Sequence, residues 1–182
     1  MRAASVATLW SESTGPPDAR RRRGTSGTTH PQMADDLTFA MGLYEARVPT
    51  DRRYSPHHMW LQDVGDGVYR VGLTAYSVRL LQDVYFLDWS FDPPREVAKR
   101  EEIGEVESSK AVSALFAPAD GRIVRFNPEL MDDPSLINAD GYRRGWLLEM
   151  TTQQPLLTAA EYVALLADVW DDTQRTIKGQ MN

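Results

Sequence analysis

The sequence has 182 residues, of which 42% are hydrophobic and 25% charged, an ordinary composition for a globular protein that can bury a core. It contains no cysteine, which excludes a disulfide framework, a thiolate nucleophile and a thiolate metal site. The net charge of −6 argues against a nucleic-acid or anionic membrane partner, and no run of about 18 apolar residues could span a bilayer.

The first 34 residues differ in composition from the rest, being rich in Ser, Thr, Gly, Pro and Arg. Such a segment buries too little apolar surface to offset chain entropy. We therefore expect a disordered tail over residues 1–34, one domain over residues 35–174 and a frayed C-terminus over residues 175–182. Three interpretations of the tail stay open: sequence upstream of a true start at Met33 or Met41, which we favour, a basic tail for an acidic partner, or a transit peptide. The first predicts a cytoplasmic bacterial protein, the last a mitochondrial one.

Short strands and glycine turns begin the domain. Residues 37–44 fit either a strand or a loose helical turn, and residues 51–56 indicate a turn. Strands are predicted at residues 59–64 and 68–73, and the Gly65–Gly67 turn between them predicts a β-hairpin because glycine adopts positive φ easily.

A short helix and more strands follow. Thr74 can cap a helix over residues 75–81, and residues 83–89 alternate as a strand. Two strands are predicted to meet at a tight tip beside Lys110. A second glycine turn, at residues 119–121, predicts another hairpin, so that glycine-turn hairpins flank the Lys110 strands.

The C-terminal third ends in a helix. A strand is predicted at residues 122–127, then a helical turn opening at Asn127-Pro128-Glu129 and a last strand at residues 146–150. Thr158 and Glu161 form a capping box for a helix that we expect to end near Gln174. Its apolar stripe consists of Tyr162, Leu165, Leu166, Val169 and Trp170. Together these elements predict a mainly β fold, a flattened barrel or sandwich with short helices at its margins and a C-terminal helix.

Lys110 is the candidate functional residue. The chain has three lysines against seventeen arginines, and lysine, unlike arginine, can lose its proton and form an amide. Lys110 is therefore either a modified side chain or a solvated surface charge. We expect Val106 and Val112 to anchor the base of its hairpin. The small residues around it, which leave room for a modifying enzyme, are Ser108, Ser109, Ala111 and Ser113.

The acidic cluster, the histidines and the tryptophans each have a structural interpretation beside a functional one. An acidic cluster near Lys110 is either a solvated face or a recognition surface for partner enzymes, and consists of Glu101, Glu102, Glu105 and Glu107. His57 and His58 have one other histidine to join them, so we expect no metal site and a histidine packed near Trp60. Large aromatic residues bury much area, and the expected core tryptophans are Trp60, Trp89, Trp146 and Trp170.

The domain contains, in this order, Arg53-Tyr54-Ser55-Pro56, His58-Met59-Trp60, Gly65-Asp66-Gly67, Val71-Gly72-Leu73-Thr74, Asp83-Val84-Tyr85-Phe86, Glu105-Val106-Glu107-Ser108-Ser109-Lys110-Ala111-Val112, Pro118 with Asp120-Gly121, Asn127-Pro128-Glu129-Leu130, Asp133-Pro134, Leu136-Ile137-Asn138 and Gly145-Trp146-Leu147. In this order the stretches resemble the H protein of the glycine cleavage system, from about Arg53 to Trp170. The Glu-Ser-x-Lys-Ala core between two strands is the most specific of them. The chain departs from the family's usual residues at Met59, Gln82 and Ser109.

The resemblance implies a fold of the lipoyl-domain type and a lipoic acid joined by an amide to Lys110. It implies that Glu107, Ser108, Ser109 and Ala111 form the recognition motif around that lysine, with Glu107 as the specific contact. Biotin carriers place their lysine between methionines, and lipoyl domains of 2-oxoacid dehydrogenases place an Asp before it, so both fit less well.

The resemblance also implies a carrier subunit and not an enzyme. Its partners would be glycine decarboxylase (P protein), which loads an aminomethyl group, the tetrahydrofolate-dependent aminomethyltransferase (T protein), dihydrolipoyl dehydrogenase (L protein), and a lipoate ligase or lipoyltransferase. Two alternatives remain: a lipoate-binding carrier of another pathway such as sulfur oxidation, and an unmodified interaction module.

Overall fold

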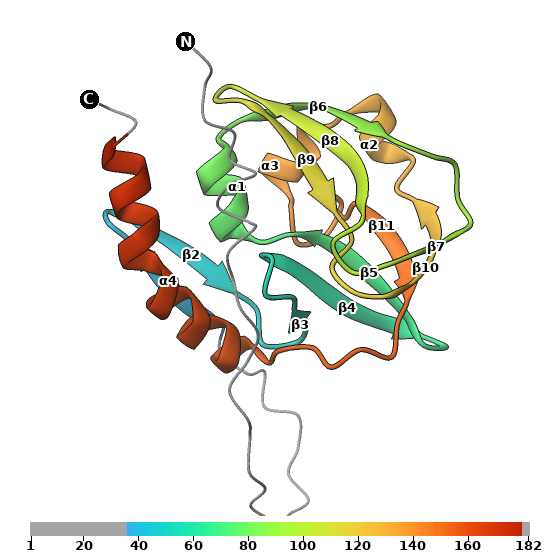
Figure 1. Ribbon diagram of the computed structural model, residues 1–182, viewed down its shortest axis with the longest axis horizontal. Coiled ribbons are helices and arrows are strands. Elements are labelled where there is room, and N and C mark those ends of the chain that lie inside the picture. The colour runs from blue at the N-terminus through green and yellow to red at the C-terminus, as the bar shows by residue number, and fades with distance from the viewer. Residues whose placement is uncertain (1–35, 180–182) are drawn as a thin grey trace, which may run out of the picture.

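Short strands make up most of the fold in the computed structural model, which describes residues 36–179 (Figure 1). The expected tail at residues 1–34 and the last three residues lie outside this part. The elements, in chain order, are β1 (Leu37–Met41), β2 (Tyr44–Val48), β3 (Arg53–Tyr54), β4 (Met59–Gly65), β5 (Val68–Leu73), α1 (Ala75–Leu81), β6 (Val84–Trp89), β7 (Arg95–Val97), β8 (Glu102–Ser108), β9 (Val112–Phe116), β10 (Gly121–Phe126), α2 (Glu129–Asp132), α3 (Leu136–Ala139), β11 (Leu148–Thr151) and α4 (Ala159–Gly179).

Within this part the strands form three sheets. A six-stranded sheet has the order β3-β4-β5-β11-β10-β7, a three-stranded sheet has the order β6-β8-β9, and β1 pairs with β2. Every neighbouring pair is antiparallel. The predicted mainly β, sandwich-like fold with a C-terminal helix is confirmed.

The main core lies between the six-stranded and the three-stranded sheets. Leu61 of β4 and Val71 of β5 reach it from one side, and Val106 of β8 and Leu115 of β9 reach it from the other. All four side chains are almost completely buried. Each contributes on the order of 1.5–3 kcal/mol to folding, so this core fixes the base of the Lys110 hairpin.

A second core covers the other face of β4. Alternation along that strand sends Met59 and Leu61 into the main core and Trp60 into the second one. There Tyr54 of β3 stacks on Tyr162 of α4, with ring centroids 4.6 Å apart. Of the expected core tryptophans, Trp60 and Trp146 are buried, while Trp89 and Trp170 are partly buried against the two cores.

The β1–β2 hairpin resolves the ambiguous segment at residues 37–44. Gly42 takes a positive φ of 70° in a tight turn, with Met41 opposite Tyr44. Phe39 and Met41 then point into the second core, where the Phe39 ring contacts Trp170 of α4 edge-on at 5.8 Å between centroids.

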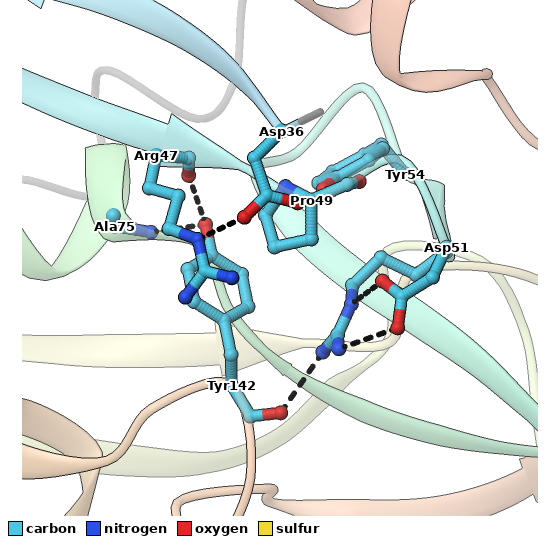
Figure 2. Close-up of polar contacts among 8 residues, drawn as sticks. Asp36, Arg47, Pro49, Asp51, Tyr54, Ala75 and Tyr142 are labelled. Atoms are coloured by element: carbon cyan, nitrogen blue, oxygen red, sulfur yellow. Dashed lines mark hydrogen bonds and ion pairs between the residues drawn. The ribbon is translucent and has the colours of Figure 1, made fainter. Parts of the chain in front are cut away.

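Tyr142 attaches this hairpin to the rest of the domain (Figure 2). Its hydroxyl donates a 2.6 Å hydrogen bond to the carbonyl oxygen of Arg47 and accepts one of 3.0 Å from the amide of Ala75. The buried Arg52 guanidinium, paired with Asp51 at 2.8 Å, donates to the Tyr142 carbonyl oxygen. The hairpin is thus joined by the same side chain to the start of α1 and to the loop before β11.

The helix caps follow the sequence signals. Thr74 Oγ1 accepts a hydrogen bond from the amide of Ser77 at the start of α1. In the capping box of α4, the Thr158 amide donates to the Glu161 carboxylate at 2.7 Å, and the Glu161 amide donates to Thr158 Oγ1 at 3.3 Å. At the start of each helix, the threonine hydroxyl thus accepts a hydrogen bond from an amide that has no partner inside the helix.

The turn at residues 119–121 does not close a hairpin, so that expectation is wrong. β9 pairs with β8, whereas β10 pairs with β11 and β7, and the turn carries the chain from one sheet to the other. Gly121 is required by close approach: a Cβ atom there would lie 2.0 Å from the carbonyl oxygen of Thr151.

Some element boundaries also differ from the sequence-based expectations. β3 lies inside the segment expected to be a turn, because Tyr54 pairs with both Trp60 and Leu157. β7 and α3 were not expected, and β11 begins at Leu148 instead of Trp146. α4 extends to Gly179, beyond the predicted end near Gln174, and no glycine or proline interrupts it earlier. No helix within residues 36–179 is long and apolar enough to cross a membrane.

Candidate functional site

Lys110 lies at the tip of the β8–β9 hairpin, as predicted. The last ladder pair joins Glu107 to Val112, and Ser109 and Lys110 lie beyond it. The tip projects above α1, on the opposite side of the molecule from the β4–β5 turn (Figure 1). Within residues 36–179 no hydrogen bond or ion pair engages the Lys110 amine, so its Nζ is available to a second molecule.

Ser108 closes the turn that presents Lys110. Its amide and its hydroxyl both donate to the carbonyl oxygen of Ala111, each at 3.0 Å. The same hydroxyl oxygen accepts from the amides of Ala111, at 3.3 Å, and Lys110, at 3.4 Å. The Ala111 methyl packs against the main core. The backbone on both sides of Lys110 is therefore fixed, although its side chain is not.

A second set of bonds ties the tip to the neighbouring strand. The Ser109 amide donates to the carbonyl oxygen of Asp83 at 3.2 Å, and Val84 pairs with Ser108 where β6 begins. The Asn138 side chain holds the backbone on both sides of Val84: its Oδ1 accepts from the Val84 amide at 3.0 Å, and its Nδ2 donates to the Val84 carbonyl oxygen at 2.7 Å. α3 thus supports β6, and β6 supports the tip.

Asp83 and Asn138 were not identified as site residues from the sequence. Both lie in stretches that resemble the known family, but nothing local indicated a role, because the two contacts that matter span 26 and 54 residues of chain. The signal that could have found Asn138 is its position directly after two apolar residues of a short helix.

The outer face of the three-stranded sheet continues the site. Phe86 of β6, Glu107 of β8 and Val112 of β9 form one cross-strand row next to the tip. Phe86 and Val112 are 43% and 51% exposed. The expectation that Val112 anchors the hairpin is therefore wrong: Val106 faces the core opposite Ser113, and the next pair faces solvent.

The predicted acidic cluster divides into two parts. Glu101 is structural, because its carboxylate accepts from Arg95 at 2.6 Å and from the Ala98 amide at 2.9 Å. Glu105 and Glu107 lie on the outer face, where Asp88 is opposite Glu105, and Glu102 is exposed at the far end of β8. Of these residues, Glu107 alone lies in the ladder pair next to the Lys110 tip.

The small residues near Lys110 differ in how deeply they are buried. Ser109 is exposed. Ser108 and Ser113 are buried, and no residue in the described part of the chain accepts or donates a hydrogen bond at the Ser113 hydroxyl. Their small size serves packing beneath the hairpin.

His58 is a structural residue, packed in the second core. Its Nδ1 lies 3.0 Å from the Tyr162 hydroxyl, and its ring centroid lies 4.7 Å from that of Tyr76. Burial lowers its pKa from 6.5 to about 3, with the nearby His57 adding to the effect. Among residues 36–179, no group of three or more His, Cys, Asp or Glu side chains is placed to hold a metal ion.

Known proteins resemble this chain over the region that contains the Lys110 hairpin. The sequence model of the family described as "Glycine cleavage H-protein" matches residues 52–169, which is more than half of the chain. The chain belongs to the glycine cleavage H-protein family. The matched region contains every residue of the Lys110 hairpin, Asp83 and Asn138.

The relatives are similar over nearly their whole length. The glycine cleavage system H protein of Mycolicibacterium vanbaalenii is 39% identical over 131 residues, covering 68% of this chain and 99% of the relative. The probable glycine cleavage system H protein of Natronomonas pharaonis is 42% identical over 124 residues, and the match covers 66% of this chain and 97% of that relative. The crystal structure of the Mycobacterium marinum H protein superposes with a TM-score of 0.59 at 38% identity, covering 66% of this chain and 99% of that one.

The β1–β2 hairpin precedes the region that matches the H-protein family. It ends at Val48, and the family match begins at residue 52. Arg52, Trp60 and Tyr142, which hold or adjoin the hairpin, lie inside the match. The hairpin thus lies outside the matched region and packs onto it.

Proposed function

We propose that the protein is the lipoyl-bearing carrier subunit of a glycine cleavage system, with lipoic acid joined by an amide to Lys110. The observation that carries the proposal is the position of Lys110. In an H-protein family member, a lysine amine without a partner in the described residues lies at a hairpin tip whose backbone is fixed on both sides. Acylation needs such an amine, because a modifying enzyme must reach it and arginine cannot replace it.

The residues around Lys110 fit this group. The exposed Ser109 and the absence of an ion pair in the described residues leave the amine accessible, while Ser108 and Ala111 aim the tip. When bound, the lipoyl group supplies a reactive dithiolane on a flexible arm, which is chemistry that a cysteine-free chain lacks. The recognition motif would consist of Glu107, Ser108, Ser109 and Ala111.

The partners we propose are glycine decarboxylase, the tetrahydrofolate-dependent aminomethyltransferase and dihydrolipoyl dehydrogenase, with a lipoate ligase or lipoyltransferase for the attachment. In this role the chain catalyses no step. Its contribution is effective concentration, because a tethered group meets successive active sites without dilution. A rigid tip on a packed sheet keeps the point of attachment constant from one partner to the next.

Reconstitution tests the glycine cleavage assignment. Lipoylated protein mixed with the cognate glycine decarboxylase is expected to support exchange of the glycine carboxyl group with labelled bicarbonate, in proportion to the lipoylated fraction. No exchange above background from fully lipoylated protein would contradict the assignment and favour a carrier of another lipoate-dependent pathway, such as sulfur oxidation.

Asn138→Ala is expected to impair attachment without abolishing it. The substitution removes both hydrogen bonds to Val84, each contributing about 0.5–1.5 kcal/mol, and loosens the start of β6 beneath the tip. We expect the melting temperature to fall by a few degrees and kcat/KM of a lipoate ligase acting on this protein to fall about threefold to tenfold at a temperature where the fold is intact.

Ser135→Ala at the N-cap of the same short helix is the matched control, since within residues 36–179 its hydroxyl bonds Asp133 and no residue of β6. An Asn138→Ala protein modified as fast as the control would show that the clamp does not position Lys110.

A further inference from the structure

A cleft of about 640 Å³ lies on the outer face of the six-stranded sheet. One cross-strand row crosses that face, with Gln62 of β4 beside Arg70 of β5, then Glu149 of β11, then Arg125 of β10. Lys110 lies at the end of the other sheet, across the main core. The arginines that line the cleft are Arg52, Arg70, Arg125, Arg143 and Arg144.

Two of these arginines are held rigidly. Arg70 and Arg125 both lie over the Trp146 ring, at 5.0 and 5.1 Å from its centroid. They share one carboxylate: Arg70 Nε donates to Glu149 at 3.0 Å, and Arg125 donates through Nε at 2.7 Å and Nη2 at 2.8 Å. The hydrogen bonds from Arg125 and then Arg70 keep the pKa of Glu149 below its ordinary value despite burial. One negative charge therefore sits between two positive ones.

Several guanidinium donors of the cleft remain uncommitted. Arg70 bonds Glu149 through Nε alone, Arg143 bonds Asp140 through Nε alone, and Arg144 bonds one oxygen of Glu129 through Nε and Nη2. Within residues 36–179 no further hydrogen bond engages their other terminal nitrogens. These donors can each bind an oxygen atom of a ligand without breaking an existing ion pair.

The cleft is rich in positive side chains, whereas the chain as a whole is negatively charged. Five arginines and two carboxylates, Asp51 and Glu129, line it, and the carboxylates of Glu149 and Asp140 pair with three of those arginines. These nine groups sum to +1, whereas the whole sequence carries a net charge of −6. Concentrating positive charge at one concave surface raises the local concentration of anions. The planar fork of arginine also suits phosphate and carboxylate oxygens better than lysine does.

We propose that this cleft binds a small anion with two or more phosphate or carboxylate groups. Its volume lies in the range of small-molecule sites, about 300–1,000 Å³. The stacked pair Arg70 and Arg125 supplies pre-oriented donors, and Arg143 and Arg144, on the loop before β11, supply further ones. The site uses no residue of the Lys110 hairpin, so binding is independent of the function proposed above.

Titration of the intact protein with pyrophosphate and, separately, citrate tests the site. Isothermal calorimetry at constant ionic strength gives the affinity, and the Trp146 indole N–H resonance reports the location. We expect saturable binding of at least one of the two anions, with tighter binding of pyrophosphate indicating a phosphate ligand and of citrate a carboxylate ligand. The Arg143→Gln/Arg144→Gln protein is expected to bind that anion about tenfold more weakly or less.

Arg122→Gln is the matched control, because Arg122 lies on β10 outside the cleft and pairs loosely with Glu96 at 3.6 Å. It removes a surface arginine and is expected to leave the affinity unchanged. The proposal is overturned if neither anion saturates, if the control weakens binding as much as the double variant, or if the Trp146 resonance does not move. Glycine–bicarbonate exchange measured with the double variant or with the Arg122→Gln control tests the carrier function and not the cleft. The two proposals can therefore fail separately.

Discussion

Lys110→Arg protein is expected to fold normally and to lose carrier activity by at least about 10³-fold, because the covalent tether that raises effective concentration is gone. Arginine keeps the positive charge and approximate length of the side chain but cannot form the amide. The Lys110 amine makes no hydrogen bond or ion pair within residues 36–179, so the free energy of unfolding should change by less than about 0.5 kcal/mol. Glycine–bicarbonate exchange and thermal unfolding measure the two effects.

Lys99→Arg is the matched control for this substitution. Lys99 is an exposed lysine whose backbone amide bonds Asp120, away from the hairpin tip. The control is expected to retain full exchange activity. Activity in Lys110→Arg protein comparable to that of the control would show that another side chain carries the group.

The second large effect is a loss of stability in mild acid, caused by His58. Its pKa is about 3 in the folded protein and about 6.5 in the unfolded chain. Between these values the unfolded chain binds a proton that the folded protein excludes, so acid favours unfolding. His58 therefore costs no stability above pH 7, and the free energy of unfolding is expected to fall by about 2 kcal/mol between pH 7 and pH 5. Urea titrations at a series of pH values measure this slope.

His58→Asn protein is expected to have a flatter profile over this pH range. Asparagine tolerates the positive φ of 61° at this position and does not titrate. The variant should be less stable at pH 7, since it loses the ring contact with Tyr76, and this offset does not affect the slope. His57→Asn is the control and should keep most of the slope, because burial is the larger cause of the lowered His58 pKa. If His57→Asn alone removed it, the assignment to His58 would be wrong.

Local chemistry explains which elements could be predicted from the sequence. The β4–β5 turn needs Gly65 and Gly67 at positive φ, α1 begins at the hydroxyl of Thr74, and α4 begins at the Thr158–Glu161 box. Each signal is satisfied within a few residues of chain. For the same reason the hairpin that presents Lys110 could be predicted, because its two strands are adjacent in sequence.

Contacts between distant strands explain what the sequence could not show. Whether residues 119–121 close a hairpin depends on which sheet receives β10, and no residue of the turn encodes that. Val112 faces solvent because of its register with Glu107. The clamp of Asn138 on Val84 joins residues 54 positions apart.

The arginine-lined cleft shows the same limit. Arg70, Arg125 and Glu149 occupy three strands and become neighbours only through the order β5-β11-β10. In the sequence they resemble ordinary surface charges on alternating strands. The Lys110 site could be found early because a whole family shares its motif, whereas the cleft required coordinates.

Mass spectrometry of the protein purified from lipoate-replete cells tests the central claim most directly. The intact mass is expected to show one lipoyl amide per chain, and peptide mapping is expected to place it on Lys110, with Lys99 and Lys178 unmodified. An unmodified chain, or a lipoyl group on either of the other lysines, would contradict the proposed carrier site.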